Sequence, residues 1–294
     1  MRRHILASWF RALPAEGASP RTLETYAAGI DAFIEHLQLH HRPTDVTKVT
    51  RADIQAFVTY VQDTSAQATA HNRFRVLRSF FNYVGDGGSG PIRREPLGII
   101  DTSPMLRMLP PKMDDTPVEL LTPDQVEKLW SETERPGTDF VARRDAAIIR
   151  LFLATGIRRG EMAALTLDDL KLNEQLAYVG GKGRKFRYVA YSAPAATALD
   201  RYLATRPRNK HAQRTNFVWL GRQGPVTSSG IYQIVESVGN RIGIELNPHQ
   251  LRHTFVDACF SQGMSEGEVM SLDFQSMISP CSYDLVVRSA YSLP

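Results

Sequence analysis

The sequence predicts a mainly helical protein that carries a small β-sheet, with an N-terminal helical domain followed by a C-terminal α+β domain. Two observations support this fold class. Apolar residues recur at helical spacing over most of the chain, and two short strand-like runs, 176–179 and 186–191, flank one glycine-rich turn. Between the two parts the helical period is lost and proline accumulates. We therefore expect domains at 1–103 and 122–294, joined by a linker at 104–121.

Length and composition set wide limits on function. The 294 residues suffice for two domains with separate cores, and the contents of 43% hydrophobic and 22% charged residues are typical of a globular protein. A net charge of +4 permits a nucleic-acid partner without requiring one, because a local basic face matters more than the total.

The termini and the cysteines predict a cytoplasmic protein without a membrane partner. The first residues form a short apolar patch, broken by Arg11, which is too short for a signal peptide, and no later segment is long enough to span a bilayer. Cys259 and Cys281 cannot form a metal cluster by themselves and do not resemble a disulfide framework. We interpret them as reduced thiols.

Capping signals predict the first helices. Ser19 and Pro20 place a cap and a first-turn proline ahead of apolar residues at helical spacing. Thr50 and Asp53 resemble a capping box at the start of the next helix.

A further helix, predicted over 71–84, interleaves aromatic and basic residues. Its arginines are candidates for DNA binding, although helical spacing alone favours a core face backed by a solvated charged face. These candidates are Arg73, Arg75 and Arg78.

The second domain begins with a helix capped at Thr122, and a strongly apolar helix over 146–153 ends at Thr155 and Gly156. The two strand-like runs follow. Later helices are predicted over 193–206, 228–242, 248–262 and 265–272.

Arg158 is the first candidate for chemistry. It follows the glycine that ends one helix and lies near the start of the next, where backbone N–H groups also favour an anion. Glu161 lies on the same helical face and is expected to orient its guanidinium, the alternative being an ordinary surface ion pair. Arg159 points to another side of the helix and is the weaker candidate.

His249 and Arg252 form a second pair, spaced i, i+3 on one face of a helix that Asn247 and Pro248 introduce. Together with an earlier arginine, they supply two planar guanidiniums and an imidazole. Guanidiniums match phosphate oxygens in pairs, so this set suits a phosphodiester. His253 points to another face and is interpreted as a packing residue.

Lys182 is predicted at the tip of a β-hairpin, between Gly181 and Gly183. An ammonium group there can reach a bound substrate and donate a proton to a departing oxygen. A solvated turn lysine is the alternative. Arg184 and Lys185 beside it are further candidates for DNA contact.

The segments 154–162, 181–183 and 249–255 resemble, in order, the successive boxes of the tyrosine recombinase (phage integrase) family. The resemblance covers roughly residues 18–285. It implies a helical core-binding domain, a catalytic domain, double-stranded DNA as partner and a tetramer on DNA. It also implies that neither a metal ion nor a nucleotide cofactor is required.

The same resemblance implies the role of each residue. Arg158 and Arg252 would clamp the scissile phosphate, His249 would hydrogen-bond to it, and Lys182 would protonate the leaving 5′-hydroxyl. A tyrosine would attack and form a 3′-phosphotyrosyl link that conserves the bond energy.

The C-terminal tail departs from the family pattern, in which a His or Trp box precedes the nucleophilic tyrosine by nine residues. Phe274 takes that place here if one residue has been lost, and counting nine onward reaches Tyr283. We therefore predict Tyr283, rather than Tyr291, as the nucleophile. Phe274 offers no hydrogen bond to phosphate, and the loss of one such donor typically costs on the order of 100-fold in rate.

Three functions remain open on the sequence. A site-specific recombinase or integrase fits the motifs and the compact core-binding domain. A recombinase-fold DNA-binding protein with an impaired active site is favoured by the unusual tail. A type IB topoisomerase-like nickase uses a similar set of residues.

Overall fold

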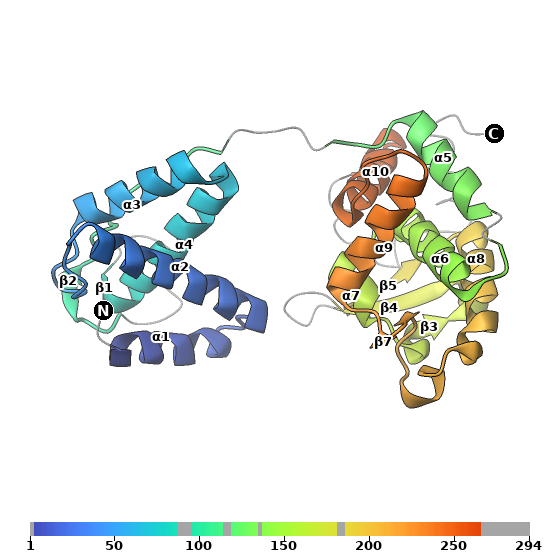
Figure 1. Cartoon of the computed structure of the whole chain (residues 1–294), viewed down its shortest axis with the longest axis horizontal. Coiled ribbons are helices and arrows are strands. Elements are labelled where there is room, and N and C mark those ends of the chain that lie inside the picture. Colours follow the sequence, from blue (N-terminus) through green and yellow to red (C-terminus); the bar gives the residue numbers. More distant parts are fainter. Residues whose placement is uncertain (1–2, 87–95, 114–118, 135–136, 181–185, 266–294) are drawn as a thin grey trace. The chain divides into compact units, whose positions relative to one another are not determined.

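The computed structural model shows two compact units, Met1–Thr116 and Pro117–Pro294 (Figure 1). No helix within the described part of the chain combines the length and the apolar character needed to cross a membrane. The residues that the structure describes are 3–86, 96–113, 119–134, 137–180 and 186–265.

The first unit is a helical domain with one pair of short parallel strands. Its helix α1 forms although no helix is predicted ahead of Ser19. Ile5, Trp9 and Leu13, spaced by four residues, bury one face of α1 in the core of this unit. The elements of the unit are α1 (Arg3–Ala15), α2 (Pro20–Leu39), α3 (Arg51–Thr64), α4 (Gln67–Val84), β1 (Gly85–Asp86) and β2 (Ile100–Thr102).

The predicted caps of this unit are confirmed. The Ser19 hydroxyl accepts a hydrogen bond from the Thr22 backbone N–H at the start of α2. Thr50 and Asp53 cap α3 reciprocally, as a capping box requires. The apolar face predicted for α4 is buried as well; it consists of Phe74, Leu77, Phe80, Phe81 and Val84.

The division between the units falls within the proline-rich segment, but both ends of that segment are packed. Met105 and Met108 belong to the core of the first unit, and Leu121 belongs to the core of the second. The Leu121 backbone N–H also donates to the Thr254 hydroxyl, 3.1 Å away. Apolar side chains near both ends of the predicted linker at 104–121 therefore belong to the cores of the two units.

The second unit is built around α6, which packs against α5, α8, α9 and α10 (Figure 1). A small antiparallel sheet in the order β3-β4-β5 lies beside these helices. The elements are α5 (Pro123–Glu134), α6 (Phe140–Thr155), α7 (Arg159–Ala164), β3 (Leu170–Lys171), β4 (Leu176–Gly180), β5 (Phe186–Ala190), α8 (Ala193–Thr205), β6 (Leu220–Gly221), β7 (Gly224–Pro225), α9 (Ser228–Arg241) and α10 (Pro248–Ser261).

The fold class is therefore confirmed, with both predicted strands present as β4 and β5. The helices predicted at 193–206, 228–242 and 248–262 correspond to α8, α9 and α10, each of which ends one residue earlier than predicted. The helix predicted at 265–272 lies outside the described residues, apart from residue 265.

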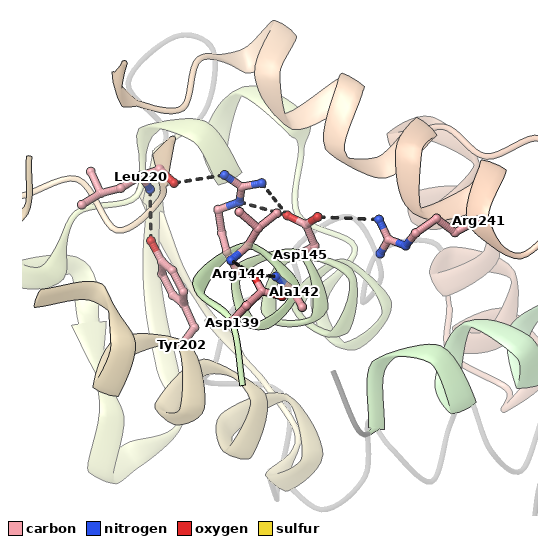
Figure 2. A network of polar contacts seen from close by, with 8 residues as sticks. Asp139, Ala142, Arg144, Asp145, Tyr202, Leu220 and Arg241 are labelled. Carbon is pink, nitrogen blue, oxygen red and sulfur yellow. Dashed lines mark hydrogen bonds and ion pairs between the residues drawn. The ribbon is translucent and has the colours of Figure 1, made fainter. Parts of the chain in front are cut away.

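A buried polar network anchors the N-terminal half of α6 to its neighbours (Figure 2). The Arg144 guanidinium donates to Asp145 from Nε and Nη2, at 2.9 and 2.7 Å, and to the Leu220 carbonyl at 3.2 Å. Arg241 of α9 lies 3.9 Å from the other Asp145 oxygen, and Tyr202 of α8 accepts from the Leu220 N–H at 3.0 Å. Burial raises the pKa of Asp145, although the Arg144 charge opposes this shift. The network fixes α6 relative to α8, α9 and β6.

At its other end α6 stops at Gly156, which has a left-handed backbone with φ of +54° and donates its N–H to the Phe152 carbonyl. The backbone there lies against the buried ring of Phe255 on α10. A Cβ added at residue 156 would lie 2.3 Å from Cδ1 of that ring. Both the positive φ and the close approach require glycine. This contact brings α10 onto the end of α6, where the site described below is formed.

We expect Gly156→Ala to lower the free energy of unfolding of the second unit by about 2–4 kcal/mol. About 1–2 kcal/mol reflects the left-handed backbone, and about 1–2 kcal/mol reflects overpacking against Phe255. Hydrogen exchange of the α6 and α10 amides measures this loss.

Gly160→Ala is the matched control. Gly160 lies in α7, and an added Cβ there has no neighbour within 4 Å. Alanine at this position is expected to leave stability unchanged or to raise it by about 0.5 kcal/mol. Equal losses in the two variants would contradict the role assigned to the α6–α10 contact.

Candidate functional site

Arg158 and Glu161 meet at the start of α7. Arg158 is the N-cap residue, and its backbone N–H donates to Oε2 of Glu161 at 3.0 Å. Its guanidinium donates from Nη1 to Oε1 of the same carboxylate, also at 3.0 Å. The Arg158 side chain is 55% exposed, whereas that of Glu161 is 3% exposed. The buried Glu161 thus binds Arg158 while most of the Arg158 side chain stays open to solvent.

Arg187 reaches the same carboxylate from the sheet. Its Nη1 and Nη2 donate to Oε1 and Oε2 of Glu161 at 3.0 and 3.1 Å, which is a bidentate pair. The Arg187 side chain is only 14% exposed. The buried carboxylate of Glu161 therefore accepts four hydrogen bonds, two from each arginine.

These contacts keep Glu161 ionised. Burial by itself raises the pKa of Glu161, but the hydrogen bonds from Arg187 and from the Arg158 backbone outweigh burial and hold the pKa below its ordinary value. A lowered pKa in the folded state means that the ionised carboxylate stabilises the fold above its unfolded-state pKa. That contribution is lost as the pH falls through the folded-state value.

Arg252 joins the cluster from α10. Its Nη1 donates to the carbonyl of Gly156, two residues before Arg158. Burial lowers the pKa of Arg252, and the positive charges of Arg158 and Arg187 lower it further, whereas Glu161 raises it. The hydrogen bond to Gly156 brings the Arg252 guanidinium to the turn that leads to Arg158, close enough for the charges of Arg158, Arg187 and Glu161 to act on it. A guanidinium is not deprotonated in proteins.

His249 lies one turn before Arg252 on α10 and is exposed. Asn247 caps the helix by accepting from the backbone N–H groups of His249 and Gln250, and Pro248 is its first residue, as predicted. The His249 ring lies 4.9 Å from the ring of His253. Burial lowers the pKa of His253, and so do the charges of His249 and Arg252. His249 therefore occupies the exposed edge of the helix that carries Arg252.

The arrangement suits an oxyanion. Two guanidiniums bind one carboxylate and a third lies at the turn just before it, so the cluster of Arg158, Arg187 and Arg252 carries a net positive charge, and the exposed Arg158 offers hydrogen-bond donors to solvent. Such an array matches the planar, paired geometry by which arginine recognises phosphate.

Other predicted site residues lie outside the described residues. This group comprises Lys182, Arg184, Lys185, Phe274, Tyr283 and the competing Tyr291. The strands on either side of the lysine turn are described: β4 and β5 pair antiparallel, with Gly180 opposite Phe186.

The arginine candidates of the first unit differ from one another. Arg75 is exposed on α4, and Arg73 is half-buried. Arg78 donates to the Met108 carbonyl, and its guanidinium lies 4.6 Å from the centre of the Phe74 ring. Burial lowers the pKa of Arg78. Its guanidinium ties the packed segment around Met108 to α4, which makes it a weaker DNA-binding candidate than Arg75.

Arg187 is the site residue that our sequence analysis does not identify. It stands opposite the buried Val179, and Val189, two residues later, stands opposite the buried Ala177. Alternation along a strand places 187 and 189 on the same inward face. A charged residue at an inward position is the signal by which Arg187 is recognisable in the sequence, since such a charge needs a buried partner.

Two family models match the chain. One, the phage integrase family, matches residues 119–273, and the other, the N-terminal SAM-like domain of phage integrases, matches residues 5–87. The first contains Arg158, Arg187 and Arg252, and the second contains α1 from its third residue onward.

Individual relatives agree with these models. The tyrosine recombinase XerD of Lacticaseibacillus casei is 33% identical over 77% of this chain and 74% of the relative. The tyrosine recombinase XerD of Listeria monocytogenes serotype 4b (strain F2365) is 29% identical over 87% of this chain and 84% of the relative. Among solved structures, a lambda integrase tetramer bound to a Holliday junction shares the fold, with a TM-score of 0.64, 16% identity, and coverage of 92% of this chain and 76% of that one.

We expect inorganic phosphate to bind the arginine cluster and to raise the melting temperature of the second unit. At ten times its dissociation constant, a ligand stabilises the folded state by about 1.4 kcal/mol, which raises Tm by on the order of 3 °C. Arg252→Gln should remove most of this rise. Thermal scans with sodium chloride at matched ionic strength correct for charge screening.

Arg159→Gln provides the control because it also removes one arginine charge, from the residue next to Arg158, but not from the cluster itself. Arg159 is exposed and lies 5.8 Å from the ring of Tyr232. It should retain the rise in Tm with phosphate. A rise that disappears in Arg159→Gln and persists in Arg252→Gln would place the anion elsewhere.

Proposed function

This chain belongs to the phage integrase family, and we propose that it is a site-specific DNA recombinase or integrase, which cuts and rejoins DNA strands by transesterification. The observation that carries this proposal is the hydrogen bond from Arg252 to the Gly156 carbonyl, which brings a second guanidinium to the turn that leads to Arg158 and its partner Glu161. Two guanidiniums fixed at one place can hold a phosphodiester while its charge redistributes during the reaction.

Arg158 and Arg252 bind the two non-bridging oxygens of the scissile phosphate, and His249 hydrogen-bonds to it from the exposed edge of α10. The phenolic oxygen of Tyr283 attacks phosphorus, gives up its proton to water and forms a new P–O bond. The bond from phosphorus to the 5′-oxygen breaks at the same time, and Lys182 gives that oxygen its proton. Attack of a 5′-hydroxyl on the phosphotyrosyl link reverses these steps and releases the tyrosine.

The partner in this reaction is double-stranded DNA, and the active assembly is a tetramer. Exchange between two duplexes involves four strands, and each strand requires its own nucleophile. The first unit supplies DNA contacts, for which Arg73 and Arg75 on α4 are the candidates. Because its substrate is DNA, we place the protein in the cytoplasm.

A recombinase-fold DNA-binding protein without cleavage activity is the second candidate. It is favoured by Phe274, which stands where the family has a hydrogen-bonding His or Trp. The intact cluster around Glu161 favours the active enzyme instead. A decayed active site would not need to keep four hydrogen bonds on a buried carboxylate.

We expect the wild-type protein to form a covalent adduct with nicked suicide duplexes, because loss of the cut end prevents rejoining. A library with a randomised core supplies the substrate, adducts are recovered from denaturing gels, and their DNA is sequenced to give the core site. Arg252→Gln should form the adduct about 100-fold or more slowly, because it removes a transition-state donor.

Tyr283→Phe should form no adduct, and Tyr291→Phe should form it at the wild-type rate. An adduct that persists in Tyr283→Phe would assign the nucleophile to another residue. If the wild-type protein binds one sequence in a salt-dependent manner and never yields an adduct, the non-cleaving DNA-binding protein is the correct function.

A further inference from the structure

Arg187 is the arginine of the cluster to which the proposed chemistry gives no role. Its guanidinium is almost buried, and both of its terminal nitrogens are directed at Glu161. Arg158, which uses the same carboxylate, keeps more than half of its side chain exposed. Arg187 is therefore buried against Glu161, whereas Arg158 is exposed and available to bind phosphate.

We propose that Arg187 is a positioning residue, which acts through Glu161 to hold Arg158 in the orientation that binds the scissile phosphate. The inference rests on the proposed function and deepens it. Arg187 does not have to touch DNA for this role. It ties the strand β5 to the first turn of α7 and thereby fixes the carboxylate on which the Arg158 backbone and guanidinium both depend.

The geometry explains why one partner for Glu161 is insufficient. The pair between Arg158 and Glu161 joins residues i and i+3, and the Arg158 side chain is 55% exposed, so water competes for its guanidinium. The exposed arginine alone can swing away from the carboxylate. The bidentate pair from a rigid strand removes this freedom from Glu161, so that Arg158 has one fixed acceptor.

Arg187 also acts on the charge of Glu161. Burial raises the pKa of this carboxyl group, and Arg187 makes the largest contribution that lowers it. Without Arg187 the carboxyl group becomes easier to protonate, and a protonated Glu161 loses acceptor capacity for Arg158. Loss of Arg187 should therefore weaken the hold of Glu161 on Arg158 more at low pH than at high pH, and only when Glu161 is present.

A double-mutant cycle tests the proposal with four proteins: the wild type, Arg187→Gln, Glu161→Gln and the double variant. Each is mixed at saturating concentration with the suicide duplex recovered above, and the single-turnover rate of adduct formation is measured between pH 5.5 and 8. The dissociation constant for the same duplex is measured separately. Circular dichroism is used to check that each variant is folded.

We expect Arg187→Gln to lower the cleavage rate about 10- to 100-fold at pH 8, the range for a misplaced binding group, while the dissociation constant changes less than about 3-fold. The ratio of its rate to the wild-type rate should fall further toward pH 5.5. In the Glu161→Gln background, Arg187→Gln should lower the cleavage rate less than about 3-fold, and the ratio of the two rates should not fall further toward pH 5.5. His249 and His253 are present in all four proteins, so the comparison isolates the pH dependence that requires Glu161.

Arg187→Lys keeps the positive charge but cannot form the bidentate pair with Glu161. It should restore the wild-type pH dependence and recover only part of the rate, which also keeps the test decisive if Arg187→Gln does not fold. Equal losses from Arg187→Gln with and without Glu161 would overturn the inference and leave the recombinase function standing. A wild-type protein that forms no adduct overturns the recombinase function, and this inference with it.

Discussion

The carboxylate of Glu161 is ionised although its side chain is only 3% exposed, and four hydrogen bonds from Arg158 and Arg187 hold it in place. A buried charge without such partners would be protonated or expelled to solvent. The rest of the site follows from this carboxylate. It caps α7, fixes one phosphate-binding arginine and opposes the mutual repulsion of three guanidiniums, so that they can remain close together.

The scaffold holds this cluster by packing at one end of α6 and by a buried polar network at the other. Gly156 lets α10 approach the end of α6, and the Gly156 carbonyl accepts a hydrogen bond from Arg252. At the opposite end of α6, the network around Arg144 and Asp145 anchors the same helix to its neighbours. A helix fixed at both ends gives the arginines a rigid frame. Rigidity matters because phosphoryl chemistry depends chiefly on position.

The sequence predicted the parts of this site that depend on near neighbours in the chain. Asn247 and Pro248 predict the start of α10, and the i, i+3 spacing of His249 and Arg252 places both on one face of that helix. The contact between Arg158 and Glu161 spans three residues and follows from helical geometry alone. Local rules suffice here because the interacting groups are joined by one turn of a helix.

Contacts between distant residues could not be predicted in the same way. Arg187 lies 26 residues from Glu161, and Arg252 lies 96 residues from Gly156. The helix α1 and the pairing of β1 with β2 also escaped prediction, since each depends on a surface formed elsewhere in the chain. The sequence by itself determined most of the helices, several of their caps and the residue types suited to phosphate. Only the tertiary structure decided which arginines share one carboxylate, because burial and the register of β5 against β4 are properties of the packed chain.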